Sequence, residues 1–144
     1  MNTPRFSELK MGTELPTITQ HYSQQAIDHY AVASLDMNPV HTNVEWAARA
    51  QVFGMPETVG QGMMTMSALA SVVTRAWGAG PAVRFVDAKF TKPVKVGERI
   101  SINGVVKQMH YNGEGKNFVT VSVKATDTAG DVVGVAEVGY SLQD

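Results

Sequence analysis

One apolar stretch, from residue 63 to residue 77, constrains the fold of this chain more than any other segment. Its apolar side chains recur at three- and four-residue steps, which predicts a helix. They are Met63, Met66, Ala70, Val73 and Trp77. Hydroxyl residues and Arg75 interrupt the stretch, which is too short and too polar to span a bilayer. The helix must therefore be buried by other parts of the chain.

The second half of the chain alternates with a period of two residues, which is typical of strands. The expected strands are Val83–Pro93, Arg99–His110, Asn117–Thr128 and Val132–Leu142. Hairpin turns are predicted at Asn112-Gly113 and at Ala129-Gly130-Asp131. One antiparallel β-sheet wrapped around the long central helix would bury that helix. The sequence therefore predicts an α+β fold of the hot-dog type.

The first half of the chain predicts shorter elements. The expected elements are a strand or extended segment over Thr13–Tyr22, a helix over Gln24–Ser34 capped by Ser23, a second short helix ending at Gln51, and a loop over Phe53–Gly62. Asn38-Pro39 is predicted to stop helical structure, because the residue before a proline favours extended geometry. Thr42 and Glu45 have the spacing of a capping box that would open the second helix.

Composition narrows the function. The chain has 144 residues, a length that predicts one domain over residues 1–144. A formal net charge of -1 and scattered lysines and arginines give no basic surface for nucleic acid. The lack of cysteine excludes disulfides, thiolate metal sites and a cysteine nucleophile, and it suits the cytoplasm. Residues 1–10 lack the apolar core of a signal peptide. We expect a cytoplasmic protein that binds neither nucleic acid nor membranes.

The segment Asp36-Met37-Asn38-Pro39-Val40-His41 holds the first candidate site. A turn at Asn38-Pro39 would bring the Asp36 carboxylate and the His41 imidazole toward one point. Two such groups that converge on a water molecule form an acid–base pair, and histidine as a residue type titrates near neutral pH. Taken alone, however, these residues favour an ordinary turn with a packed or surface histidine.

The second candidate site is Gly60-Gln61-Gly62, which leads into the long helix. Glycine lets a ligand approach the backbone closely, and free N–H groups at a helix start can bind the oxygen of an enolate. A plain glycine-rich loop before a core helix is the other reading. The cluster around Met63 fits flexible core packing or the lining of an acyl tunnel.

Together these features resemble the MaoC-like dehydratase family, which includes the (R)-specific enoyl-CoA hydratases. The resemblance covers nearly the whole chain. It rests on the Asp-x-Asn-Pro-Val-His segment, on the helix start Gly62-Met63-Met64-Thr65-Met66, and on Phe90-Thr91-Lys92-Pro93-Val94.

This resemblance implies a homodimer or dimer-based oligomer and no metal or redox cofactor. Asp36 and His41 would be catalytic and would activate the water that adds to a trans-2-enoyl thioester of coenzyme A or acyl-carrier protein. Asn38 would order the polar site, and the Gly62 N–H would bind the thioester oxygen. The product would be an (R)-3-hydroxyacyl thioester.

One residue departs from the family pattern. The family usually has histidine directly before the glycine, where this chain has Gln61, which does not titrate near neutral pH. We expect Gln61 and Met63 to lie near the pocket. Two alternatives stay open, a hot-dog thioesterase and a subunit of a heteromeric dehydratase. The predicted long helix carries no Asp or Glu, which a thioesterase commonly places there.

Overall fold

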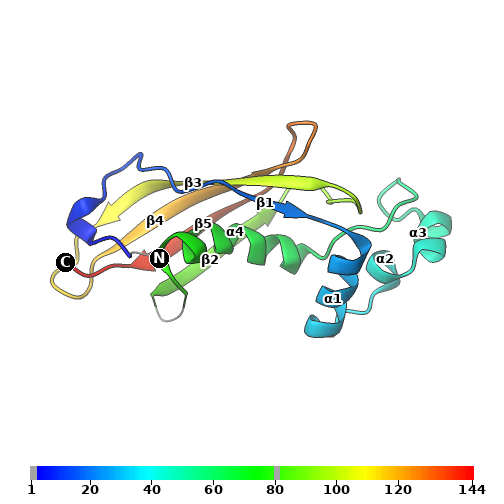
Figure 1. Cartoon of the computed structure of the whole chain (residues 1–144), viewed down its shortest axis with the longest axis horizontal. Helices are drawn as coiled ribbons and strands as arrows, with labels where there is room; N and C mark the ends of the chain where they lie inside the picture. Colours follow the sequence, from blue (N-terminus) through cyan, green and yellow to red (C-terminus); the bar gives the residue numbers. More distant parts are fainter. Residues whose placement is uncertain (1–2, 80–81) are drawn as a thin grey trace.

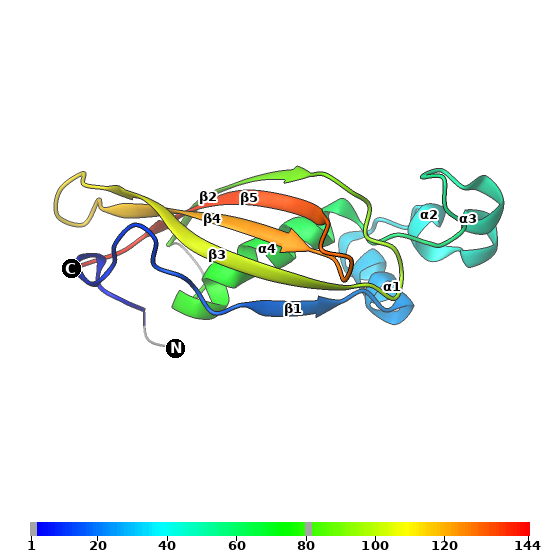
Figure 2. The same cartoon turned by 90° about the horizontal axis from the view of Figure 1, so that it is seen from above.

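A five-stranded antiparallel sheet forms the body of the computed structural model, which describes residues 3–79 and 82–144 (Figure 1). The strand order is β1-β3-β4-β5-β2. The strands are β1 (Ile18–His21), β2 (Val83–Phe90), β3 (Arg99–His110), β4 (Phe118–Thr126) and β5 (Val132–Ser141). Helix α4 (Gly62–Trp77) lies across one face of this sheet (Figure 2). The predicted α+β class and hot-dog fold are confirmed.

The two-residue alternation in β4 sets which side chains reach the core. Val119, Val121, Val123 and Ala125 are all buried. Thr120, on the opposite face, is buried as well, and its hydroxyl pairs with Nε2 of His110 at 2.8 Å. The turns after β3 and β4 are also confirmed, and Gly113 and Gly130 adopt the positive φ angles that such turns need.

The buried face of helix α4 includes Val73 and Trp77 of the predicted face but not Met63, Met66 or Ala70. Leu69 and Val73 are fully buried, whereas 56% of Met63 is exposed. The inward side chains are Met64, Thr65, Ala68, Leu69, Val72, Val73 and Trp77. Because the helix is apolar on most sides, several faces satisfy the same spacing, and the curvature of the sheet decides which one is covered.

The first strand is shorter than predicted. The expectation covered Thr13–Tyr22, but β1 begins at Ile18. Before it, Glu14 makes one isolated bridge to Val105. Pro16 separates the bridge from the strand, because proline has no N–H to donate to a ladder.

Three short helices lie together beyond one end of the sheet (Figure 1). They are α1 (Gln24–Ser34), α2 (Pro39–Thr42) and α3 (Val44–Ala50), and one 3-10 turn, η1 (Phe6–Glu8), lies near the N-terminus. The Ser23 cap of α1 is confirmed, since its hydroxyl accepts from the Ala26 N–H at 3.1 Å.

Two predictions in this region need correction. Asn38 is not helical, with ψ of 128°, as predicted, but Pro39 then begins α2, since proline suits the first position of a helix. Asn43, rather than Thr42, caps α3, and its side chain accepts from the Trp46 N–H at 2.9 Å. Thr42 is already the last residue of α2.

Two features are missing from residues 3–79 and 82–144. No helix there combines the length and the apolar character needed to cross a membrane. In the same ranges, no three His, Cys, Asp or Glu side chains gather in a way that would hold a metal ion.

Candidate active site

The turn between α1 and α2 carries the candidate acid–base pair. Helix α1 ends at Leu35, which adopts a left-handed conformation with φ of 61°. Asp36 follows, and its Oδ1 accepts a long hydrogen bond of 3.4 Å from the Asn38 N–H. Asn38 Oδ1 accepts from the Val40 N–H at 3.1 Å and so caps α2. The predicted turn therefore exists, and the side-chain oxygen of Asn38 holds its second half in place.

His41 is fixed from one side and faces Asp36 on the other. Its Nδ1 lies 2.7 Å from the carbonyl oxygen of Val59. A carbonyl only accepts, so Nδ1 carries the hydrogen and the neutral ring has an unprotonated Nε2. This Nε2 lies 3.7 Å from Oδ2 of Asp36, with 12% of the His41 side chain and 46% of the Asp36 side chain exposed. The distance is too long for a direct hydrogen bond.

His41 and Gly62 line the same cavity, which has a volume of about 450 Å³. Apolar side chains dominate its wall, namely Phe53, Val59, Phe90, Pro93, Val94 and Val133. Asp36 is not part of that wall, and its carboxylate faces Nε2 of His41. The cavity thus combines an apolar lining with one imidazole, an arrangement that suits a hydrocarbon ligand with one reacting centre.

Gly62 begins α4 and contributes its backbone to the cavity. Within the described ranges its N–H donates to no protein acceptor, as expected for the first turn of a helix. A methyl group added to its Cα would lie 3.2 Å from Cε2 of Phe90. The glycine therefore keeps this N–H accessible between the helix start and the Phe90 ring, where the helix dipole favours a negatively charged oxygen.

Gln61 and Met63 flank Gly62 but do not line this cavity. The Gln61 side chain is 1% exposed and turns toward α1, where its Nε2 donates to the carbonyl oxygen of Ile27 at 3.1 Å. Its Oε1 is buried without a hydrogen-bond partner in the described part of the chain. The Met63 side chain is largely exposed. Gln61 therefore contacts the fold behind the site.

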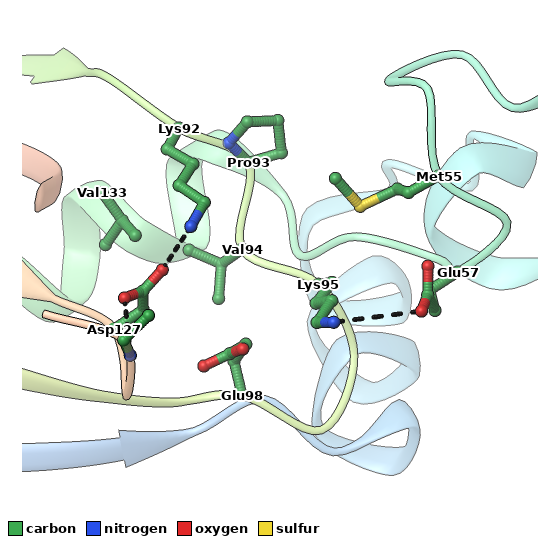
Figure 3. A pocket seen from close by; sticks show the side chains of 10 residues that line it. Met55, Glu57, Lys92, Pro93, Val94, Lys95, Glu98, Asp127 and Val133 are labelled. Atoms are coloured by element: carbon green, nitrogen blue, oxygen red, sulfur yellow. Dashed lines mark hydrogen bonds and ion pairs between the residues drawn. The ribbon is translucent and has the colours of Figure 1, made fainter. Parts of the chain in front are cut away.

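A second pocket of about 390 Å³ adjoins the first (Figure 3). The two share Lys92, Pro93, Val94 and Val133. The Lys92 ammonium contacts Asp127 at 2.7 Å and Asp131 at 2.9 Å. This pairing raises the pKa of Lys92 above its ordinary value and lowers the pKa of Asp127 below its own. Lys92 therefore joins the segment after β2 to the hairpin between β4 and β5 through two ion pairs.

Several cavity residues were not assigned a role from the sequence. Phe53 and Val59 reach the cavity from the loop between α3 and α4, and Thr65 reaches it from α4. Thr65 follows Gly62 by three residues, and that helical spacing was the available signal. The segment from Phe90 to Val94 is one on which the family resemblance rests, but that resemblance did not predict that these residues line the pocket.

Most of the chain is similar to known proteins. The model of the MaoC like domain family matches residues 7–129. The chain is similar to the (R)-specific enoyl-CoA hydratase of Rhodospirillum rubrum, with 28% identity over 133 residues that cover 89% of this chain and 84% of the relative.

Two solved structures share the fold of this chain. The R-hydratase PhaJ1 from Pseudomonas aeruginosa, in its unliganded form, has a TM-score of 0.80 and 25% identity, covering 97% of this chain and 86% of its own. The ChsH1-ChsH2 complex from Mycobacterium tuberculosis has a TM-score of 0.76 and 20% identity, covering 93% of this chain and 98% of its own. The second likeness shows a shared fold.

Proposed function

Because this chain belongs to the MaoC-like domain family, we propose that it is a hydratase that reversibly adds water to a trans-2-enoyl-CoA and gives an (R)-3-hydroxyacyl-CoA. One observation carries the proposal. His41, whose Nε2 faces Asp36, and the N–H of Gly62 lie at one largely apolar cavity. A hydratase needs these three parts, an acid–base pair, a donor for the thioester oxygen and a space for the acyl chain.

The reacting water would sit between Asp36 and His41. With the ring neutral, Nε2 of His41 and Oδ2 of Asp36 are both acceptors, and they lie 3.7 Å apart. One water molecule can donate a hydrogen to each of them. Its oxygen adds to C3 of the enoyl group while one of its protons passes to the pair, and the pair supplies a proton to C2. One water is thereby added across the C2–C3 double bond.

Gly62 would act on the thioester carbonyl. As the water oxygen attacks C3, negative charge moves to the carbonyl oxygen of C1, forming an enolate. The Gly62 N–H would donate to that oxygen, and the start of α4 adds positive potential there. No metal or redox cofactor takes part in this proposal, and coenzyme A enters only as part of the substrate.

We also propose a homodimer in the cytoplasm. Strands β1 and β2 are the two edges of the sheet, and β2 carries the partly exposed Phe85 and Phe90. Apolar side chains on an edge strand suit pairing with another strand. Phe90 also lines the cavity, so a partner at this edge would lie close to the site.

The experiment follows the loss of the conjugated enoyl-thioester absorbance on a panel of short, branched and aromatic enoyl-CoAs, with chiral analysis of the product. Asp36→Ala and His41→Ala should each lower kcat by about 100-fold to 10,000-fold. No hydration of any substrate, or a turnover in both variants equal to that of the wild type, would contradict the proposal. Release of free thiol instead would identify a thioesterase. Activity that appears only after addition of a second dehydratase chain would identify a heteromeric subunit.

A further inference from the structure

A buried tyrosine lies directly behind the cavity wall. Tyr22 has no exposed surface, and its hydroxyl lies 2.7 Å from Oγ1 of Thr65. Its ring packs on Gly60, where a methyl group added to the glycine would lie 2.5 Å from Cδ2 of the ring. Gly60 and Thr65 both line the cavity. Tyr22 therefore supports two cavity residues from the inside without touching the cavity itself.

The direction of this hydrogen bond follows from burial. Thr65 is the only partner of the Tyr22 hydroxyl among the described residues. If Thr65 donated, the phenol hydrogen would be buried without an acceptor, which is unfavourable. Burial also raises the pKa of Tyr22, which keeps the phenol protonated. Tyr22 therefore donates and Thr65 accepts.

This direction leaves the hydrogen of the Thr65 hydroxyl free. Ser67, Ser71 and Thr74, the other hydroxyl residues of α4, each donate to a carbonyl of their own helix. Thr65 makes no such bond in the described chain, and no hydrogen bond joins it to the unpartnered Oε1 of Gln61. Thr65 is only 4% exposed, and the surface on which it meets open space is the cavity wall.

We propose that Thr65 is a second hydrogen-bond donor to the thioester oxygen, beside the N–H of Gly62, and that Tyr22 orients it. Residues three apart lie on the same helix face, and helical side chains lean toward the N-terminus, so Thr65 leans over the turn that begins at Gly62. This inference rests on the proposed function, because it assigns a donor to the same substrate. A ligand without the carbonyl oxygen would leave the hydroxyl unpaired in an apolar cavity.

The test compares two ligands that differ at that oxygen. Butyryl-CoA has the thioester carbonyl, and S-butyl-CoA, a thioether, has a methylene group in its place. Thr65→Val removes the hydroxyl at constant shape, and Thr65→Ser is the matched control that keeps it. We expect Thr65→Val to raise the Kd of butyryl-CoA roughly 10-fold and to leave that of S-butyl-CoA unchanged, with Thr65→Ser close to the wild type on both. Isothermal titration calorimetry measures all six values.

Each outcome decides a different point. An equal change in Kd for both ligands, or no change for either, overturns the role of Thr65 while leaving hydration intact. A wild-type protein that binds neither ligand overturns the proposed function as well. If Thr65→Val does not fold, Thr65→Ala replaces it, with the same selectivity expected.

Tyr22→Phe tests the orienting role. Removing the phenol hydroxyl frees Thr65 to turn away, so the preference for butyryl-CoA over S-butyl-CoA should fall about three-fold to 10-fold. The infrared carbonyl stretch of bound ¹³C-labelled butyryl-CoA gives an independent readout, because each donor lowers this frequency. The stretch should rise in Tyr22→Phe and Thr65→Val. A frequency equal to that of the wild type in both variants would contradict the inference.

Discussion

Nδ1 of His41 lies 2.7 Å from the carbonyl oxygen of Val59. Val59 in turn donates its N–H to the carbonyl of Val40 at 3.2 Å, so the helix with the histidine and the loop before α4 hold one another. The bond fixes both the ring orientation and its tautomer. The basic nitrogen of the neutral ring then faces Asp36, as water activation requires.

His41→Asn separates the two functions of the ring. An asparagine amide can still donate to the Val59 carbonyl but has no basic nitrogen at the place of Nε2. We expect kcat to fall by about 100-fold to 10,000-fold in His41→Asn and in His41→Ala, with a lower melting temperature in the alanine variant alone. Steady-state kinetics and thermal unfolding measure these effects. Activity retained in His41→Asn would show that Nε2 takes no proton.

Asn38 should matter through its helix cap. Asn38→Ala removes the acceptor for the Val40 N–H, which costs about 0.5–2 kcal/mol in the free energy of unfolding. Because α2 carries His41, kcat should fall as well. Asn38→Ser keeps a capping oxygen and should restore most of both quantities. If Asn38→Ser has normal stability but the low activity of Asn38→Ala, the amide group itself contacts the substrate.

The sequence predicted the sheet well because its signal is local. Each buried residue of β4, such as Val121, is identified by its immediate neighbours. The acid–base segment was also located, because Asn38 and Pro39 act within one turn. In contrast, the choice between Thr42 and Asn43 as a helix cap depended on where α2 ends. Both are good capping residues, and the sequence alone does not separate them.

The cavity wall could not be predicted from the sequence, because residues from distant segments form it. Phe53 and Phe90 are 37 positions apart in the numbering and come to line one cavity only in the folded chain. The direction of Gln61 likewise depends on the carbonyl of Ile27, which α1 brings to it. Periodicity places a residue on a face, but the packing of other elements decides what that face meets.

Gly60 and Gly62 should respond differently to alanine. At Gly60 the new methyl group would meet the ring of Tyr22, which is fully buried and cannot move aside. We expect Gly60→Ala to cost about 1–3 kcal/mol in the free energy of unfolding. At Gly62 the methyl group meets Phe90, whose ring is 47% exposed and can shift.

Gly62→Ala should therefore fold with a stability close to that of the wild type and lose activity, since the methyl group narrows access to the N–H. Chemical denaturation and hydratase assays distinguish the two variants. Equal losses of stability at both positions would contradict this account of the cavity wall.

The ion pair between Lys92 and Asp127 should make stability depend on pH. The hydrogen bond from Lys92 lowers the pKa of Asp127 below its ordinary 3.8, and bonds from the Asp131 and Ala129 N–H groups lower it further, against the opposing effect of burial. A carboxyl whose pKa is lowered by folding stabilises the fold above its unfolded pKa. That contribution is lost as the pH falls through the folded value.

Asp127→Asn keeps an oxygen for the two backbone donors but removes the charge. We expect its melting temperature to lie below that of the wild type between roughly pH 5 and 9, and the difference to shrink as the pH falls below 3.8. The same ion pair is also lost at high pH, when Lys92 loses its charge. Because Asp127 and Asp131 raise the pKa of Lys92 above 10.5, this loss of stability occurs only at higher pH. Thermal unfolding across pH, with Asp131→Asn as the exposed control, measures the effect. A melting temperature of Asp127→Asn equal to that of the wild type at every pH would show that the backbone bonds alone hold the hairpin.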